Sequence, residues 1–332
     1  MAWVIEQGYP VKTLALVLAC AVMLGAGPVH ARGADPVATS HDSLPAAAAS
    51  NLSTKLEKLY AVEESRGYSG NERIDAIVVA YEDLFAGEGR NDQLASIADA
   101  DLELLYRAAY TASFYSGDPV HANEVIRLFG ALENRELIDR SHRVQLYGTL
   151  VGARMFDRAR AFQRTYPDDG LEILPLVRHA PNLAGPTAWA VDPIDRVLVE
   201  QAIDLEAPSA VVVVSHPGCH FSQAAVAAIE ADPVLGPLFA QHANWLAPPS
   251  TRVDFDPMQR WNREHPDASV SLAIRRGDWP LIDNWSTPTF YFFRNGKIEA
   301  QVIGWPLDGV GRRQEVVDAL QTIGLLEQST DG

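Results

Sequence analysis

Apolar residues recur at the spacing of an α-helix throughout the first half of the chain. Breaks that contain glycine or proline, such as Ser116–Pro119, separate successive apolar stripes. The stripes begin at Leu52, Ile74, Leu102, Val125, Val144 and Phe156. This pattern predicts an all-α region of helices in antiparallel pairs that fills residues 51–167.

The last part of this region has a more specific pattern. From Leu146 to Pro167 the sequence suits a helix, a short turn, an Ala-rich second helix and a closing proline. The segment resembles a degenerate tetratricopeptide unit, although the period is not regular along the chain. The resemblance implies an array of helical hairpins, and the aromatic stripe is interpreted as core rather than as a peptide-binding groove.

A different pattern begins after a proline- and glycine-marked connection at residues 168–186. Apolar residues between Val197 and Leu205 alternate with polar ones, which is the period of a half-buried strand. Together with Thr187–Val191, this arm predicts a hairpin. The boundary between an all-α domain and a following domain is therefore expected near residue 180.

Strands and helices alternate beyond the hairpin. The expected strands are Ala210–Val214, Asn244–Leu246, Val270–Ile274, Thr289–Phe293 and Glu299–Ile303. The expected helices are Cys219–Ala231, Asp256–Glu264 and Arg312–Ile323. The order predicts an α/β domain over residues 187–326, followed by a tail at residues 327–332.

The N-terminus is typical of an export signal. Lys12 precedes an apolar stretch from Leu14 to Gly27, which is followed by the small-residue site Val29-His30-Ala31. We expect a signal peptide at residues 1–31, cleavage after Ala31, and a periplasmic location. Residues 32–50 are rich in Ala, Pro and Ser and predict a flexible linker.

Two alternatives for the N-terminus stay open. Val17–Cys20 resembles the processing site of a bacterial lipoprotein, in which case Cys20 would carry a lipid anchor. An uncleaved leader would instead anchor the protein in a membrane, although the apolar stretch is shorter than the roughly 20 residues that a spanning helix needs.

Charge and cysteine content narrow the function further. The formal net charge is −16, which argues against binding to nucleic acid through a basic surface. The chain contains 2 cysteines, Cys20 and Cys219. After cleavage, Cys219 would remain alone without an internal disulfide partner, and such a thiol in an exported protein is buried, paired between molecules or reactive.

Cys219 follows a buried strand and a Pro-Gly break, at the point where a helix is expected to begin. The thiolate is the nucleophile in disulfide exchange, and the N-terminus of a helix favours that anion. His216 and His220 would add positive charge or a hydrogen bond. Ser222 lies one turn on and would donate a hydrogen bond to the sulfur. We therefore predict a thiol-reactive site at Cys219.

The order of these motifs resembles the thioredoxin-like superfamily over residues 187–326. The superfamily keeps a Cys-x-x-Cys motif where this chain has Cys219-His-Phe-Ser222, and a cis-proline where it has Thr287-Pro288. The resemblance implies that Pro288 lies beside the thiol and that the Thr287 backbone pairs with an extended substrate. Trp285 is expected to line that groove. The additional segments look more like exported, membrane-associated members than like compact thioredoxin.

The departures from this family are equally informative. Ser222 stands where the resolving cysteine is expected, so an internal disulfide cannot form. Gly218 replaces the usual tryptophan, and Val213 replaces a buried acid that some members keep. Cys219–Ser222 also resembles the motif of monothiol glutaredoxins, which bind an iron–sulfur cluster with glutathione. The chain lacks their glycine-rich turn, so no cofactor is expected.

Two hypotheses for function remain. In the first, an exported monothiol protein forms mixed disulfides with protein or small-molecule thiols, and an external thiol resolves them. In the second, the fold is a redox-inactive scaffold that recruits a protein partner through its helical domain. His216, Cys219 and His220 are also conceivable ligands for a soft metal ion, but no fourth ligand is evident and no metal is expected.

Overall fold

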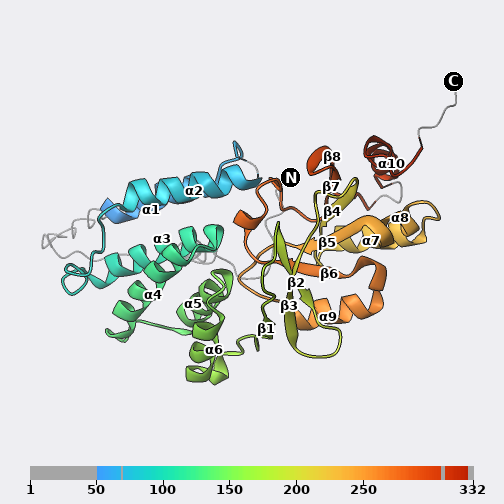
Figure 1. Cartoon of the computed structure of the whole chain (residues 1–332). Coiled ribbons are helices and arrows are strands. Elements are labelled where there is room, and N and C mark those ends of the chain that lie inside the picture. Colours follow the sequence, from blue (N-terminus) through green and yellow to red (C-terminus); the bar gives the residue numbers. More distant parts are fainter. Residues whose placement is uncertain (1–50, 69, 308–310, 328–332) are drawn as a thin grey trace, which may run out of the picture. The chain divides into compact units, whose positions relative to one another are not determined.

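The computed structural model describes residues 51–68, 70–307 and 311–327. Figure 1 shows the elements of the chain in sequence order. The signal peptide predicted for residues 1–31 and the linker predicted for residues 32–50 lie outside the described residues, as does most of the predicted tail. None of the helices in the described ranges is long and apolar enough to cross a membrane.

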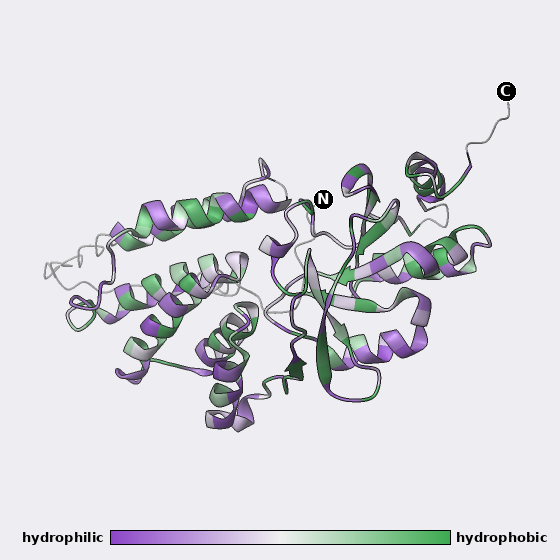
Figure 2. Ribbon diagram, viewed as in Figure 1, coloured by the Kyte–Doolittle hydropathy of each residue, from purple (hydrophilic) through white to green (hydrophobic). Residues whose placement is uncertain are grey.

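An all-α region comes first, as the apolar stripes predict. Its helices pack through buried stripes that include Ile77, Leu102 and Val125, each with 0% of its surface exposed. The helices show purple and green residues interspersed along their length in Figure 2, which is the pattern of amphipathic helices. They are α1 (Asn51–Glu64), α2 (Gly70–Phe85), α3 (Asp99–Ser116), α4 (Pro119–Glu133), α5 (Arg140–Gly152) and α6 (Phe156–Thr165).

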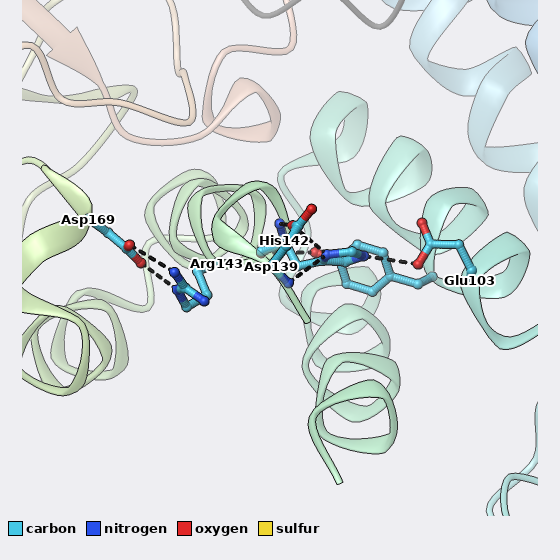
Figure 3. Close-up of polar contacts among 6 residues, drawn as sticks. Glu103, Asp139, His142, Arg143 and Asp169 are labelled. Carbon is cyan, nitrogen blue, oxygen red and sulfur yellow. Dashed lines mark hydrogen bonds and ion pairs between the residues drawn. The ribbon is translucent and has the colours of Figure 1, made fainter. Parts of the chain in front are cut away.

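Local capping explains where two of these helices begin. Asp118 accepts a hydrogen bond from the backbone N–H of Val120, and Pro119 occupies the first turn of α4, where its missing N–H is not needed. Asp139 and His142 form a reciprocal capping box at the start of α5. Arg143, on the next position of α5, holds Asp169 in the 3₁₀ turn η1 (Pro167–Asp169) through two hydrogen bonds (Figure 3).

A mixed eight-stranded sheet with helices follows, in the order β1-β3-β2-β6-β5-β4-β7-β8. Strands β4, β5 and β6 run parallel to one another, while β7 is antiparallel to β4 and β2 is antiparallel to β6. The strands are β1 (Leu176–Arg178), β2 (Thr187–Val191), β3 (Val197–Ala202), β4 (Ala210–Val214), β5 (Ala243–Ala247), β6 (Val270–Ala273), β7 (Thr289–Arg294) and β8 (Lys297–Ile303).

Both faces of the central strand β4 are covered, because every one of its residues is buried. Val211 and Val213 pack into a core that includes buried residues of helix α7, whereas Val212 and Val214 pack on the other face against Trp279 and Trp285. Burial on both faces accounts for the uninterrupted valine run, since alternation is expected only where one face is solvated. The helices of this half are α7 (His220–Ala231), α8 (Leu235–His242), α9 (Phe255–Glu264) and α10 (Arg313–Thr322).

Two elements differ from the expectations. The connection predicted at residues 168–186 contains β1, which pairs in parallel with β3. Three residues are too few to show a periodic pattern. Helix α8 was also not expected, since its Gly236-Pro237 pair suggests a turn, although Pro237 lies in the first turn, where proline is tolerated.

Two hydrogen-bonded contacts join the helical region to the sheet region. Asn71, in the first turn of α2, donates from its backbone N–H to the carbonyl oxygen of Asp283 at 3.0 Å and from its amide to that of Ile282 at 3.0 Å. Arg154, between α5 and α6, donates to carbonyl oxygens at the end of β6 and just beyond it: Ala273 at 3.1 Å and Ile274 at 2.7 Å. The two regions thus share satisfied polar contacts in addition to apolar packing.

Candidate functional site

The strand topology brings several chain segments to one edge of the sheet. Strands β4, β5 and β6 end at this edge because they are parallel, and β7 begins there because it is antiparallel to β4. The segments after β4, β5 and β6 and the segment before β7 therefore meet. This edge of an α/β sheet is where ligands and reactive groups are usually found.

Cys219 lies in the segment after β4, at the N-cap position of α7. Its backbone N–H donates to the carbonyl oxygen of His216 at 2.9 Å, and its carbonyl oxygen accepts the first helical hydrogen bond from Gln223 at 2.9 Å. The side chain is a free thiol that is partly exposed. The turn that these hydrogen bonds close therefore places the sulfur at the start of the helix.

The thiol has a partner on the segment that precedes β7. The Sγ of Cys219 donates to the carbonyl oxygen of Thr287 at 3.2 Å, and the peptide bond between Thr287 and Pro288 is cis. Residues 68 positions apart in the sequence are thus in direct contact. Pro288 was expected beside the thiol; the hydrogen bond of the sulfur is to the preceding residue, Thr287.

His216 was expected to add positive charge or a hydrogen bond, and its side chain forms a hydrogen bond within the turn before Cys219. Its Nδ1 accepts a hydrogen bond from the backbone N–H of Gly218 at 3.0 Å, so this nitrogen carries no proton. Its Nε2 lies 3.7 Å from the Oδ2 of Asp254. Burial lowers the pKa of His216; the nearby charge of Asp254 opposes this shift, and Arg252 reinforces it. At neutral pH the imidazole is uncharged, and it orders the turn before Cys219 instead of supplying a positive charge.

The position before the cysteine is restricted by the same imidazole. A Cβ atom built on Gly218 would lie 3.1 Å from the Nδ1 of His216, closer than most real contacts of this kind. A large side chain at this position would therefore displace the ring of His216. This contact gives a physical reason for glycine at this position.

Ser222 is fully buried, with 0% of its surface exposed. Its hydroxyl oxygen accepts a long hydrogen bond from the backbone N–H of His216 at 3.4 Å. The expected donation from Ser222 to the sulfur is not formed; the hydroxyl stabilises the turn instead. Val213 is likewise fully buried in β4.

His220 is exposed at the first position of α7 and makes no hydrogen bond to any residue in the described ranges. The two histidines therefore differ in exposure, since His216 is half-buried and His220 is exposed to solvent. Within the described part of the chain, no three His, Cys, Asp or Glu side chains form a group that could hold a metal ion.

Trp285 was expected to line a substrate groove, and the structure gives it a mainly buried position with 7% of its surface exposed. The guanidinium of Arg276 stacks over its ring at 5.3 Å from the centroid. Trp285 therefore packs within the apolar core at this edge of the sheet. Four further tryptophans of this half of the chain are buried too, namely Trp245, Trp261, Trp279 and Trp305.

Several residues that shape this edge were not identified from the sequence. Asp254 has a left-handed backbone with φ 53, which aspartate tolerates better than most residues. The carboxylate of Glu172 braces this corner by accepting from the backbone N–H groups of Val253 at 2.9 Å and Phe255 at 3.2 Å. Burial raises the pKa of Glu172, and these two hydrogen bonds oppose the rise. No local sequence pattern marks these contacts, because they join segments that are distant along the chain.

A comparison of the chain with models of protein families, with curated proteins and with solved structures finds no match. The functional argument therefore depends on the chemistry of the edge that carries Cys219. That edge offers a partly exposed thiol at a helix start, a backbone carbonyl within hydrogen-bonding distance, and a buried hydroxyl in place of a second thiol.

Proposed function

We propose that residues 187–326 form a thioredoxin-like domain and that Cys219 forms mixed disulfides with protein or small-molecule thiols. The single observation that carries this proposal is the position of the sulfur, partly exposed at the N-cap of α7 and 3.2 Å from the carbonyl oxygen of Thr287. A structural thiol would be packed among apolar side chains and inert. We also propose that the protein acts after export, where disulfide substrates are present.

The proposed reaction is an exchange in two steps. The thiolate of Cys219 attacks one sulfur of a substrate disulfide, forms a mixed disulfide and releases the other sulfur as a thiolate, which takes up a proton. A second, external thiol then attacks the mixed disulfide, releases Cys219 as the thiolate and leaves with the substrate sulfur in a new disulfide. Disulfides are conserved through the cycle, so no electron acceptor is needed.

Different residues of the chain contribute to different steps of this exchange. The start of α7 favours the thiolate through the helix dipole, and neutral His216 holds the turn that presents the sulfur. The carbonyl oxygen of Thr287 holds the protonated thiol before reaction. Ser222 cannot attack the mixed disulfide, because a hydroxyl is not a thiol, and the second step therefore falls to an external partner.

The proposal is tested by alkylation of Cys219 with iodoacetamide in the folded protein over a range of pH, followed by mass analysis of the peptide that contains it. We expect modification of the folded protein without unfolding, because the thiol is partly exposed at the start of α7. Glutathione in the same tube is the reference.

A thiol that reacts only after denaturation would contradict the proposal. In that case the alternative, a scaffold that recruits a partner through α1–α6, would be favoured. The two outcomes differ in a single measured quantity, the alkylation rate of folded relative to unfolded protein.

A further inference from the structure

A second feature of the same sheet edge is a hollow of about 190 Å³ lined by the segments that follow β5 and β6. Ser250 and Thr251 line it from the β5 side, and Arg275 and Arg276 line it from the β6 side. The turn between α3 and α4, from Phe114 to Pro119, completes its wall. The hollow is thus built by both regions of the chain, apart from the residues that contact the thiol.

Arg276 is a partly buried cation without a countercharge. Its guanidinium forms no hydrogen bond or ion pair with any residue in the described ranges, and its ring contact is the stack over Trp285 at 5.3 Å. Burial lowers the pKa of Arg276 to about 10, so it remains charged at neutral pH. Because its N–H donors have no partner among the described residues and are not fully buried, they are available to an acceptor that enters the hollow.

Two further arginines add to the positive charge. Arg154 donates to the carbonyl oxygens of Ser250 at 3.3 Å and Ile274 at 2.7 Å, both of which line the hollow. Burial, with a smaller contribution from the charge of Arg275, lowers the pKa of Arg154 to about 9, which still leaves it charged at neutral pH. Neither Arg154 nor Arg275 forms an ion pair with a carboxylate in the part of the chain that the structure describes.

One acidic side chain does lie on the wall of the hollow. Asp118 is exposed, and its Oδ1 accepts a hydrogen bond from the backbone N–H of Val120 at 2.7 Å, which caps α4. One carboxylate oxygen of Asp118 is therefore occupied by the cap at the start of α4. The formal charge around the hollow is positive, because Arg154, Arg275 and Arg276 outnumber Asp118. The net charge of the whole chain, in contrast, is −16.

The size of the hollow restricts the ligand. A volume of about 190 Å³ is smaller than the roughly 300 Å³ at which sites for drug-sized ligands begin. Nucleotides are therefore too large, whereas a small acid or a single acidic group at the end of a longer molecule fits. A guanidinium that stacks on an aromatic ring presents its N–H donors in one plane, which suits an oxyanion with two coplanar acceptors.

We propose that this hollow binds a small oxyanion, a carboxylate or a phosphate group, through Arg276. Two chain segments lead from this hollow to residues near the thiol. Trp285, which stacks under Arg276, is two residues before Thr287, whose carbonyl contacts Cys219. The segment of Ser250 and Thr251 continues to Asp254, which lies 3.7 Å from His216. The proposal does not depend on the redox function, because anion binding needs no thiol chemistry.

The test is isothermal titration of the full chain with succinate in one arm and inorganic phosphate in the other. We expect one-to-one binding of at least one anion, weakened by added sodium chloride, and the arm with the tighter binding identifies the oxyanion. In Arg276→Gln we expect the dissociation constant to rise by about tenfold or more, since a charge-assisted pair is lost. Arg260→Gln removes the same charge from an exposed position on α9 outside the hollow, and it is expected to bind like the wild type.

A second variant keeps the test informative if Arg276→Gln does not fold. A Cβ atom on Gly277 would meet nothing within 4 Å, so Gly277→Asp fits and places a carboxylate beside Arg276. We expect this variant to lose anion binding. The proposal is overturned if the wild type binds neither anion at millimolar concentration, if binding survives both Arg276→Gln and Gly277→Asp, or if Arg260→Gln weakens it equally.

Discussion

Cys219 stands between two backbone environments that favour opposite protonation states. The carbonyl oxygen of Thr287, 3.2 Å from the sulfur, accepts the S–H proton and stabilises the thiol. The first turn of α7 stabilises the thiolate, although the sulfur accepts no capping hydrogen bond from it. The sulfur is therefore both hydrogen-bonded to a backbone carbonyl and placed at the start of a helix.

Arg154 has an equally clear role at the scale of a single residue. Its guanidinium donates to carbonyl oxygens of Val151, Ser250, Ala273 and Ile274, and stacks over Trp189 at 5.3 Å. We predict that Arg154→Met lowers the free energy of unfolding by about 3 kcal/mol or more, because buried carbonyls would lose their partner. Urea unfolding followed by circular dichroism measures the change.

The control for this prediction is Arg154→Lys, which keeps the charge but lacks the planar fork that reaches several carbonyls. We expect its stability to fall between the wild type and Arg154→Met. Equal stability of all three proteins would mean that the carbonyls find other partners and that Arg154 does not join the two regions.

At the scale of elements, the start of α5 contains a titratable contact. His142 Nδ1 lies 2.7 Å from Asp139 Oδ1, and its Nε2 lies 2.9 Å from Glu103 Oε2 on α3 (Figure 3). The hydrogen bond to Glu103 is the main cause that raises the pKa of His142; partial burial opposes the rise, and Asp139 adds to it. The contact therefore links two helices most strongly when the imidazole is protonated.

The raised pKa predicts how stability depends on pH. A group whose pKa is higher in the folded state contributes stability that is complete below its unfolded pKa of about 6.5 and is lost as the pH rises through the folded pKa. We predict that Glu103→Gln destabilises the protein more at about pH 6 than at about pH 8.5. Urea midpoints at the two values measure this difference.

A matched control is Glu57→Gln, which removes an exposed carboxylate on α1 that has no partner in the described ranges. Its effect on the midpoint should not change between the two pH values. If Glu103→Gln gave the same loss at both, or a larger one at the higher pH, the account of His142 would be wrong.

The elements with a long, regular pattern were predictable from the sequence. Helices α1–α6 and strands β2 to β8 follow from helical stripes, strand alternation and turn residues, with small shifts at their ends. Strand β1 and helix α8 were not predictable from the sequence, because their short segments show no decisive period. The sheet and its packing determine their conformation.

At the scale of the whole molecule, the part of the site that depends on chain order was predictable. A cysteine after one strand and Thr287-Pro288 before another meet once the strands are neighbours, and β4 pairs with β7. The contacts of His216 with Asp254, of Arg276 with Trp285, and of Glu172 with its two N–H donors depend on how loops fold over the sheet edge. Only tertiary structure reveals them.

The exchange chemistry of the whole protein is tested most directly by reaction with oxidised glutathione, followed by intact mass measurement, in a Cys20→Ser background that leaves Cys219 as the sole cysteine. We predict that the folded protein accumulates one glutathione adduct, which persists until an external thiol is added. In Ser222→Cys the adduct should disappear as a disulfide forms between positions 219 and 222. An adduct that forms only after denaturation, or one that persists equally in Ser222→Cys, would contradict the account.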